Sequence, residues 1–301
     1  MSYDDIIIPE LLPPSEDGVF KTLMTHPDAE PVLRDVVESY LRFPVVKVAV
    51  KNVELPISDI NEKRERFDVS CTVNDGSQLD VEMQSESMTG DSQRSDHQVV
   101  KGRAIYHLCD LHSGQSGRSI RYDKLMRSFQ VTFCGYTVFP EHNSFVRRFS
   151  FRDENGMELS GAVGIIFVEL TKLGDVLKKP VETMTGEEIW SIFFAYGADQ
   201  KYSDLLGKMI VAKEEIKMAK ELLQTISRDE NERARFRARR KFQMDMEHNL
   251  LVARDEGRDE GEEAKAVAIA KNLLEMNLPI EQIVKATGLT HEEIEGLRVA
   301  N

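Results

Sequence analysis

Apolar residues recur with helical spacing near the start of the chain. From Asp17 to Tyr40 they repeat every three or four positions, which is typical of amphipathic helices packed on a core. Pro27 interrupts this pattern, and because proline ends or kinks a helix, we predict two helices, one on each side of it. Residues 1–15 show no such period and are predicted to form an irregular lead-in.

A period of two replaces the helical period further along the chain. Every second residue is apolar in two short runs, which contain Phe67, Val69, Cys71 and Val73 and then Leu79, Val81 and Met83. The segment Asn74-Asp75-Gly76 between them is a strong turn signal, and glycine suits the left-handed position of such a loop. The pattern therefore predicts a β-hairpin with one apolar and one polar face.

The remaining elements alternate between helix and strand. We predict a helix over residues 96–113, strands over 128–139 and 144–151, and a short buried strand over 165–170. From about Thr185 the composition is helical. This succession predicts an α/β fold and excludes an array of internal repeats.

The C-terminal region divides into a charged segment and a compact tail. Residues 250–263 contain the tetrapeptide Arg-Asp-Glu-Gly twice, and paired glycines favour a mobile connector over a helix. Residues 264–301 are predicted to form three short helices in a helix-turn-helix-like layout. Thr290 is expected to cap the last helix, with Glu293 completing a capping box.

The net charge of the chain argues against a nucleic-acid partner, but the distribution of charge along the chain permits one. Of 301 residues, 39 are Lys or Arg and 52 are Asp or Glu, so the net charge is -13, whereas phosphate binding favours a basic surface. Residues 245–263 hold eight acids against two arginines, and residues 235–241 form a local basic block. That block is either a solvated helix face or a DNA contact. Net charge therefore does not exclude a DNA substrate, and the 41% of apolar residues exclude a wholly disordered chain.

Cysteine usage and hydropathy indicate a protein of a reducing compartment. Three cysteines without C-x-x-C spacing do not predict a disulfide framework or a zinc site, and His107 and His112 beside Cys109 lack a fourth ligand at supporting spacing. The N-terminus has no signal-peptide pattern, and no apolar run approaches the roughly 20 residues that span a bilayer. We expect a cytoplasmic location and no membrane partner.

Two acidic residues, Asp68 and Glu82, fall on the polar face of the predicted hairpin. Matching of the two faces requires a three-residue loop. A loop of residues 74–76 sets Asp68 opposite Glu82, whereas a loop of residues 75–77 sets Asp68 opposite Gln84. In both registers the two acids lie on the same face of adjacent strands, with Cβ atoms roughly 5–8 Å apart.

Neighbouring carboxylates repel each other, so a positive charge must compensate them. One candidate is a divalent cation, and Mg²⁺ characteristically binds one or two carboxylates while phosphate and water complete its ligands. The alternative is a solvated sheet face on which basic side chains neutralise the acids, with Lys63, Arg64 and Arg66 as the candidates. Spacing alone leaves both interpretations open.

Several motifs, taken in order, resemble one known family. Residues 17–21 (DGVFK), 66–69 (RFDV), the Asn74-Asp75-Gly76 turn and residues 81–84 (VEMQ) are similar to the PD-(D/E)XK nuclease-family transposases, also called the recombination-promoting nuclease/putative transposase (Rpn) family. Further similarity lies in Arg103-Ala-Ile-Tyr106, in Glu169-Leu-Thr-Lys172 and in the tail. The resemblance covers most of residues 15–172 and about 250–297, and residues 173–249 match weakly.

The resemblance implies a fold and an activity. The fold is α/β: a restriction-endonuclease-like core, with a mixed central sheet flanked by helices, and a helical C-terminal extension. The activity is metal-dependent hydrolysis of DNA phosphodiester bonds that promotes recombination. The chain then divides into a lead-in, a nuclease-like core, a helical region, a charged connector and a helix-turn-helix-like tail, over residues 1–15, 16–172, 173–249, 250–263 and 264–301.

The resemblance also implies roles for particular residues. Asp68 is the metal-binding aspartate and Glu82 the second acid, so both are expected metal ligands. Gln84 occupies the position of the lysine in the general motif, and its neutral amide can still hold water by hydrogen bonds.

Asp17 matches an acidic position on the first helix, and Lys21, one turn later, is expected to reach the same site. Arg103 and Tyr106 are expected to contact a phosphate. The alternative for these last two is simple packing of the helix on the sheet, with Tyr106 half-buried.

The expected cofactor is Mg²⁺, with Mn²⁺ or Ca²⁺ as alternatives, and the expected partners are DNA and further copies of the chain, joined through the C-terminal helices. The missing motif lysine and the acidic charge support another hypothesis, a catalytically weak or inactive relative that binds DNA or assembles as an oligomer. A transcriptional regulator acting through the tail is a third interpretation. The segment from Thr290 to Leu297 is acidic and disfavours it, because it would repel phosphate.

Overall fold

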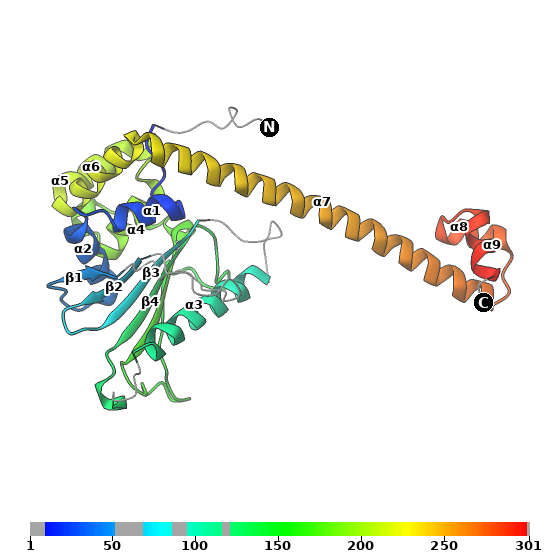
Figure 1. Ribbon diagram of the computed structural model, residues 1–301, viewed down its shortest axis with the longest axis horizontal. Coiled ribbons are helices and arrows are strands. Elements are labelled where there is room, and N and C mark those ends of the chain that lie inside the picture. The colour runs from blue at the N-terminus through cyan, green and yellow to red at the C-terminus, as the bar shows by residue number, and fades with distance from the viewer. Residues whose placement is uncertain (1–9, 52–68, 86–94, 116–120, 300–301) are drawn as a thin grey trace. The chain divides into compact units, whose positions relative to one another are not determined.

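The computed structural model describes residues 10–51, 69–85, 95–115 and 121–299 (Figure 1). The chain separates into two compact units, residues 1–241 and residues 242–301. The strands and the candidate site belong to the first unit. Asp68 and the basic candidates Lys63, Arg64 and Arg66 lie outside the described residues.

The first two helices confirm the predicted break near Pro27. Helix α1 spans Asp17–Met24 and helix α2 spans Glu30–Leu41. Each buries one apolar face: Phe20, Leu23 and Met24 in α1, and Val32, Leu33, Val36, Val37 and Tyr40 in α2. Burial of these faces against the sheet outweighs the modest helix propensity of the valines and aromatic residues.

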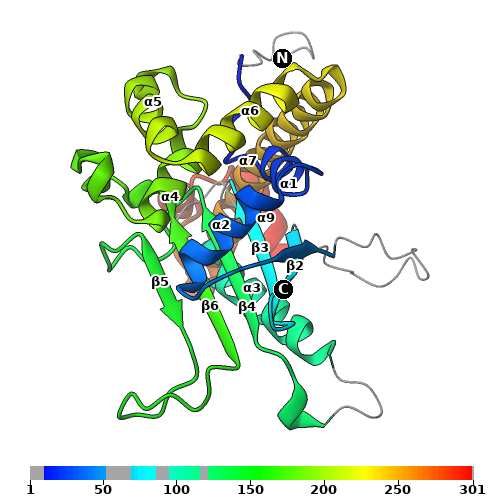
Figure 2. The same ribbon diagram turned by 90° about the vertical axis from the view of Figure 1, so that its left-hand side faces the viewer.

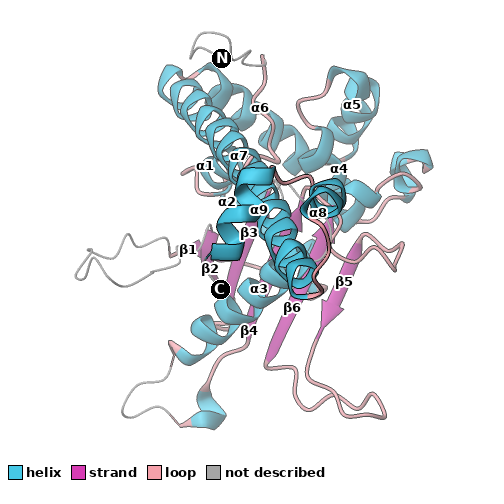
Figure 3. Cartoon of the chain, turned by 90° about the vertical axis from the view of Figure 1, so that its right-hand side faces the viewer, coloured by secondary structure: helices cyan, strands magenta, loops and turns pink. Residues whose placement is uncertain are grey.

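A six-stranded mixed sheet forms the centre of the first unit, as the α/β prediction requires (Figure 3). Its strands are β1 (Val48–Val50), β2 (Val69–Val73), β3 (Gln78–Gln84), β4 (Ser128–Cys134), β5 (Val146–Phe149) and β6 (Val163–Glu169). Their order is β1-β2-β3-β4-β6-β5. Strands β3, β4 and β6 run parallel, and the other neighbours pair antiparallel. The three-residue strand β1 was not predicted.

Strand β4 ends at Cys134, five residues before the predicted end at Phe139. The backbone N–H groups of Val138 and Phe139 donate to Glu169 Oε1 at 2.7 and 3.0 Å instead of joining the sheet. The other oxygen of Glu169, Oε2, accepts from Lys172 at 2.8 Å. The buried Glu-Leu-Thr-Lys end of β6 therefore anchors the loop after β4.

The hairpin has the register of the loop formed by residues 74–76. Ser70 pairs with Asp80 and Cys71 pairs with Leu79. The Val73 N–H donates to Ser77 O at 3.0 Å, and Gly76 adopts the left-handed conformation with φ 86°. Of the two registers that face matching allowed, the structure has the first.

Two layers of helices cover the sheet (Figure 2). On one side its apolar residues pack against α1 and α2, together with α4 (Gly186–Tyr196), α5 (Ser203–Ala212) and α6 (Glu214–Arg228). On the other side α3 (Ser95–Ser113) packs against β4 and β6 through Val100, Ala104 and Leu108. Short 3-10 helices complete this unit at Tyr122–Lys124, Leu170–Lys172, Val176–Lys178, Val181–Thr183 and Gln200–Tyr202. The polar face of the hairpin is therefore buried beneath α3.

Helix α7 runs without interruption from Glu230 to Glu275. It includes residues 250–263, so the expectation that paired glycines keep this segment from being helical is wrong. A glycine costs a helix about 1 kcal/mol relative to alanine, and the many Arg, Glu, Ala and Lys residues around these two offset that cost. One-turn charge pairs add support, as between Arg258 and Asp255 at 3.5 Å.

The second unit contains a small three-helix core, as predicted. The end of α7 packs with α8 (Ile280–Thr287) and α9 (His291–Val299) around Ala270, Ile283, Leu289 and Ile294. Thr290 and Glu293 form the predicted capping box, in which the Thr290 N–H donates to Glu293 Oε2 at 2.7 Å and the Glu293 N–H donates to Thr290 Oγ1 at 3.3 Å. None of the described helices is both long enough and apolar enough to cross a membrane.

Candidate active site

Strand β3 carries three polar side chains on the face that α3 covers. Leu79, Val81 and Met83 face the main core, so the alternation of a strand turns Asp80, Glu82 and Gln84 to the opposite side. Asp80 is 0% exposed and Glu82 is 1% exposed. The sheet thus holds two carboxylates in a site closed to solvent.

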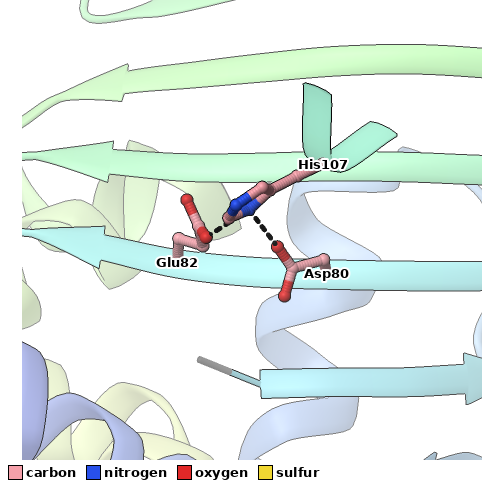
Figure 4. A group of neighbouring side chains, drawn as sticks. All are labelled: Asp80, Glu82 and His107. Atoms are coloured by element: carbon pink, nitrogen blue, oxygen red, sulfur yellow. Dashed lines mark ion pairs between the residues drawn. The ribbon is translucent and has the colours of Figure 1, made fainter. Parts of the chain in front are cut away.

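Helix α3 brings an imidazole between these carboxylates (Figure 4). His107 Nδ1 lies 2.6 Å from Glu82 Oε1 and 3.6 Å from Asp80 Oδ2. His107 is itself buried, with 1% of its surface exposed. One ligand atom from each of the three residues lies within 4.8 Å of the other two. These three side chains are called the acid–imidazole cluster below.

Arg103 reaches the same cluster from one turn earlier on α3. Its Nη2 lies 3.6 Å from Glu82 Oε1, and its side chain is partly exposed. Arginine and histidine four residues apart on a helix share one face, which explains why both meet Glu82. In the described part of the chain, Arg103 and His107 are the cations that pair with these acids.

Burial and mutual contact shift the pKa values within the cluster. Burial raises the pKa of Asp80 to about 6, the charge of Glu82 acts in the same direction, and nearby His107 opposes both. Burial alone would lower the pKa of His107, but contacts with Asp80 and Glu82 and the charges of both raise it to about 10. The two acids therefore favour the protonated form of the His107 imidazole, and burial disfavours the charged form of Asp80.

The donor set of the cluster fits a divalent cation. His107 and Gln130 lie beside Asp80, but among the described residues no hydrogen bond of standard geometry reaches either oxygen of Asp80 or the amide oxygen of Gln130. Buried acceptors without donors are costly, and native structures rarely leave them so. Asp80, Glu82 and His107 could hold a cation that satisfies these oxygens.

Two further predicted residues lie at the end of β3. Gln84 is the last residue of the strand and is buried. Asp17 Oδ1 accepts a hydrogen bond from the N–H of Ser85, the next residue, at 3.0 Å. The structure therefore brings the start of α1 to the end of the strand that carries Glu82 and Gln84.

The structure does not bring Lys21 and Tyr106 into the cluster. Tyr106 is 57% exposed, and its ring centroid lies 6.2 Å from that of His107. No contact recorded among the described residues joins Lys21 to Glu82 or Gln84. The packing alternative predicts a half-buried Tyr106, and the observed side chain is more exposed than that.

Sequence reasoning did not place Asp80 and His107 in the site. The alternation of the hairpin puts Asp80 on its polar face, where its charge is of the kind that a metal site requires, and His107 was not predicted to be a ligand because no fourth ligand lies at supporting spacing. The spacing of four between Arg103 and His107 is the signal that links His107 to Glu82. A contact between a helix and a strand some 25 residues apart is invisible to local periodicity.

The basic block of α7 lies against the start of α1. Arg240 Nη1 is 3.8 Å from Glu16 Oε1, and Arg235 pairs with Glu232 on its own helix. A Cβ atom at Gly18 would lie 1.1 Å from Arg239 Nη1, so glycine makes room for this guanidinium. Part of the block is therefore engaged within the protein, close to Asp17.

A family model described as PD-(D/E)XK nuclease family transposase matches residues 14–253. The match includes residues 173–249, which sequence inspection had matched only weakly, and it ends before the tail of residues 264–301. No curated protein and no solved structure matches the chain. With a mixed sheet, two helical layers and a buried acidic site on β3, the chain belongs to the PD-(D/E)XK nuclease family transposases.

Proposed function

We propose that this protein is a metal-dependent DNA endonuclease that hydrolyses phosphodiester bonds and thereby promotes recombination. The observation that carries the proposal is the buried pair Asp80 and Glu82 in a chain of the nuclease family. Among the described residues, neither oxygen of Asp80 accepts a hydrogen bond of standard geometry. Buried carboxylates of this kind are unfavourable for stability, and a cation-dependent activity gives a reason for them. The proposal includes strand cleavage and no strand-joining step.

Asp68 and Glu82 are the proposed ligands of the divalent cation, with Asp80 and His107 beside Glu82. Mg²⁺ is the cation proposed from the carboxylates, with Mn²⁺ and Ca²⁺ as alternatives. Such a cation supplies Lewis-acid polarisation of a phosphoryl oxygen and lowers the pKa of water.

The other proposed site residues act on water and on the phosphate. Gln84 has no charge, so its amide orients a water molecule through hydrogen bonds. Arg103 pairs with Glu82 and its side chain is partly exposed, so its guanidinium can donate to a phosphate oxygen. Asp17 holds the end of β3 that carries Gln84. Lys21 and Tyr106 are proposed to contact the DNA backbone outside the cluster.

A second candidate function is a weak or inactive relative that binds DNA or assembles as an oligomer. The observation that favours it is the pairing of Glu82 with both Arg103 and His107, because two cations already balance the charges of Asp80 and Glu82. Gln84 also replaces the lysine of the general motif, whose positive charge would lie beside the phosphate.

Nicking of supercoiled plasmid tests the first candidate. The full-length protein is expected to convert supercoiled DNA to open circles with Mg²⁺ or Mn²⁺ and to stop when EDTA removes the metal. Glu82→Gln and Asp68→Asn, which keep the side-chain shape, should each lower the rate at least about a hundredfold. Glu214→Gln is the matched control, because Glu214 is exposed on α6 and pairs only with Lys217 among the contacts described for it. If the Glu82 and Asp68 variants nick at the rate of the control, the assigned site is wrong, and no nicking by the unmodified protein favours the second candidate.

A further inference from the structure

We propose that His107 is a metal ligand and that Asp80, Glu82 and His107 form a site that prefers Mn²⁺ to Mg²⁺. The inference rests on the proposed function in one respect, since both place a divalent cation at Glu82. It goes further by adding a nitrogen ligand from α3, which the carboxylates of the hairpin do not supply. A nitrogen ligand changes which cation the site selects.

The geometry of the cluster is close to that of a bound cation. Neighbouring ligand atoms on an octahedral ion with bonds of about 2.1 Å lie about 3 Å apart. The two distances from His107 Nδ1, 2.6 Å to Glu82 Oε1 and 3.6 Å to Asp80 Oδ2, lie on either side of this value. The three ligand atoms therefore already lie near the spacing of a bound ion, between a strand and a helix that pack together (Figure 4).

Asp80 supplies an independent observation that points to a cation. It is fully buried, and its contacts with His107 and with Gln130, its neighbour on β4, include no hydrogen bond of standard geometry to either oxygen. Among the described residues, the amide oxygen of Gln130 has no donor of standard geometry either. A cation between Asp80 and His107 would satisfy the acid, whereas the 3.6 Å separation from the imidazole leaves it without a good hydrogen bond.

The preference for Mn²⁺ follows from the ligand types. Mg²⁺ favours oxygen ligands. An imidazole nitrogen suits the transition metals better than it suits Mg²⁺. Two carboxylates and one imidazole therefore shift selection from Mg²⁺ to Mn²⁺.

The competing occupant of the cluster is a proton. A protonated His107 would remain the counter-ion of Glu82 and Asp80, with Arg103 and Gln130 as the other polar groups around them. In that case no nitrogen of His107 could bind a metal. The two arrangements differ in whether a nitrogen nucleus lies in direct contact with the metal.

Electron spin echo spectroscopy of Mn²⁺ bound to the full-length protein separates the two arrangements. We expect one Mn²⁺ per chain with nitrogen modulation from a directly bound imidazole. His107→Gln should abolish the modulation and weaken Mn²⁺ binding at least about tenfold, while Mg²⁺ binding changes less. His112→Gln is the matched control, because His112 is on the same helix and contacts Ser128 instead of the cluster, and it should leave the modulation intact.

The spectrum of the unmodified protein can overturn the inference by itself, and the His107→Gln variant assigns the nitrogen. If Mn²⁺ binds and supports nicking but shows no nitrogen modulation, His107 is not a ligand, and the proposed function stands. If Mn²⁺ does not bind, the inference is wrong, and if nicking is also absent, the proposed function fails separately. Thermal unfolding of both variants shows whether they fold, and modulation that persists in a folded His107→Gln protein would assign the nitrogen to another residue.

Discussion

The carboxylate of Asp17 at the start of α1 accepts a hydrogen bond from the backbone N–H of Ser85 at 3.0 Å. The two residues lie 68 positions apart, and Ser85 directly follows Gln84. The hydrogen bond fixes the end of β3, whose other residues include Glu82. The position of this strand end therefore depends on a helix formed much earlier in the chain.

Substitutions at Asp17 should distinguish the effect of its hydrogen bond to Ser85 from the effect of its charge. Asp17→Ala removes the acceptor and should destabilise the protein by about 1 kcal/mol, with slower nicking because the end of β3 loses its anchor. Asp17→Asn keeps an acceptor oxygen and should retain most of the stability, as urea unfolding would measure. If the Asn variant is as stable as the unmodified protein but does not nick, Asp17 acts through its charge as well as its hydrogen bond.

Gly135→Ala should also disturb the end of β3, because Gly135 contacts Gln84 and Ser85. The Gly135 N–H donates to Gln84 O at 2.8 Å, and a Cβ atom there would lie 2.3 Å from the backbone oxygen of Ser85. A clash with backbone cannot be relieved by a rotamer change, so we expect a loss of about 1–3 kcal/mol in stability together with reduced nicking.

Gly18→Ala is the control for this clash. The three atoms nearest to its added Cβ all belong to the guanidinium of Arg239, a flexible group that can move aside, so the loss of stability should be smaller. Denaturant titration of both variants measures the difference. Equal destabilisation by the two substitutions would contradict the tight approach between Gly135 and Ser85.

Asp75 should contribute to stability in a defined pH range. The nearby hydroxyl of Ser77 and the hydrogen bond that its N–H donates to Asp75 Oδ1 at 2.9 Å, followed by the contact with Arg127, lower the pKa of Asp75 to about 2. A carboxyl group whose pKa is depressed on folding stabilises the protein above the pKa of the unfolded state, near 4, and this contribution disappears as the pH falls toward 2. Asp75→Asn should therefore be less stable than the unmodified protein at pH 6, with a difference that shrinks between pH 4 and pH 2.

Chemical unfolding at several pH values measures this difference. The group is largely exposed, so the effect should be small. A difference between the two proteins that stays constant from pH 6 to pH 2 would show that the charge of Asp75 is not its source.

Self-association is predicted to depend on exposed apolar residues of α7. The second unit exposes a run of such side chains, namely Phe242, Met246, Leu250, Leu251 and Val252. Apolar surface on a helix that is charged elsewhere favours burial against another chain. Leu251→Glu should therefore lower the oligomeric mass measured by light scattering after size exclusion.

Val211→Glu is the control for self-association, because Val211 is exposed on α5, outside the C-terminal helices. It should leave the mass unchanged. A monomeric unmodified protein, or an equal effect of both substitutions, would contradict association through the C-terminal helices.

The sequence alone determined the features that depend on near neighbours in the chain. Alternation with a period of two predicted the hairpin and its two faces, Pro27 predicted the break between α1 and α2, and the pair Thr290–Glu293 predicted the cap of α9. Each of these rests on residues a few positions apart, where local geometry decides the outcome. The motifs also predicted the family, which the match over residues 14–253 confirms.

Only the tertiary structure decided what covers the polar face of the hairpin. Local pattern is compatible with a solvated face, and burial beneath α3 is what brings His107 and Arg103 to Glu82. Strand β4 ends early because the N–H groups of Val138 and Phe139 donate to Glu169, about 30 residues further along the chain. Helix α7 continues through Gly257 and Gly261. Contacts between distant segments depend on which faces pack together, and burial of the apolar residues of the whole chain decides that packing.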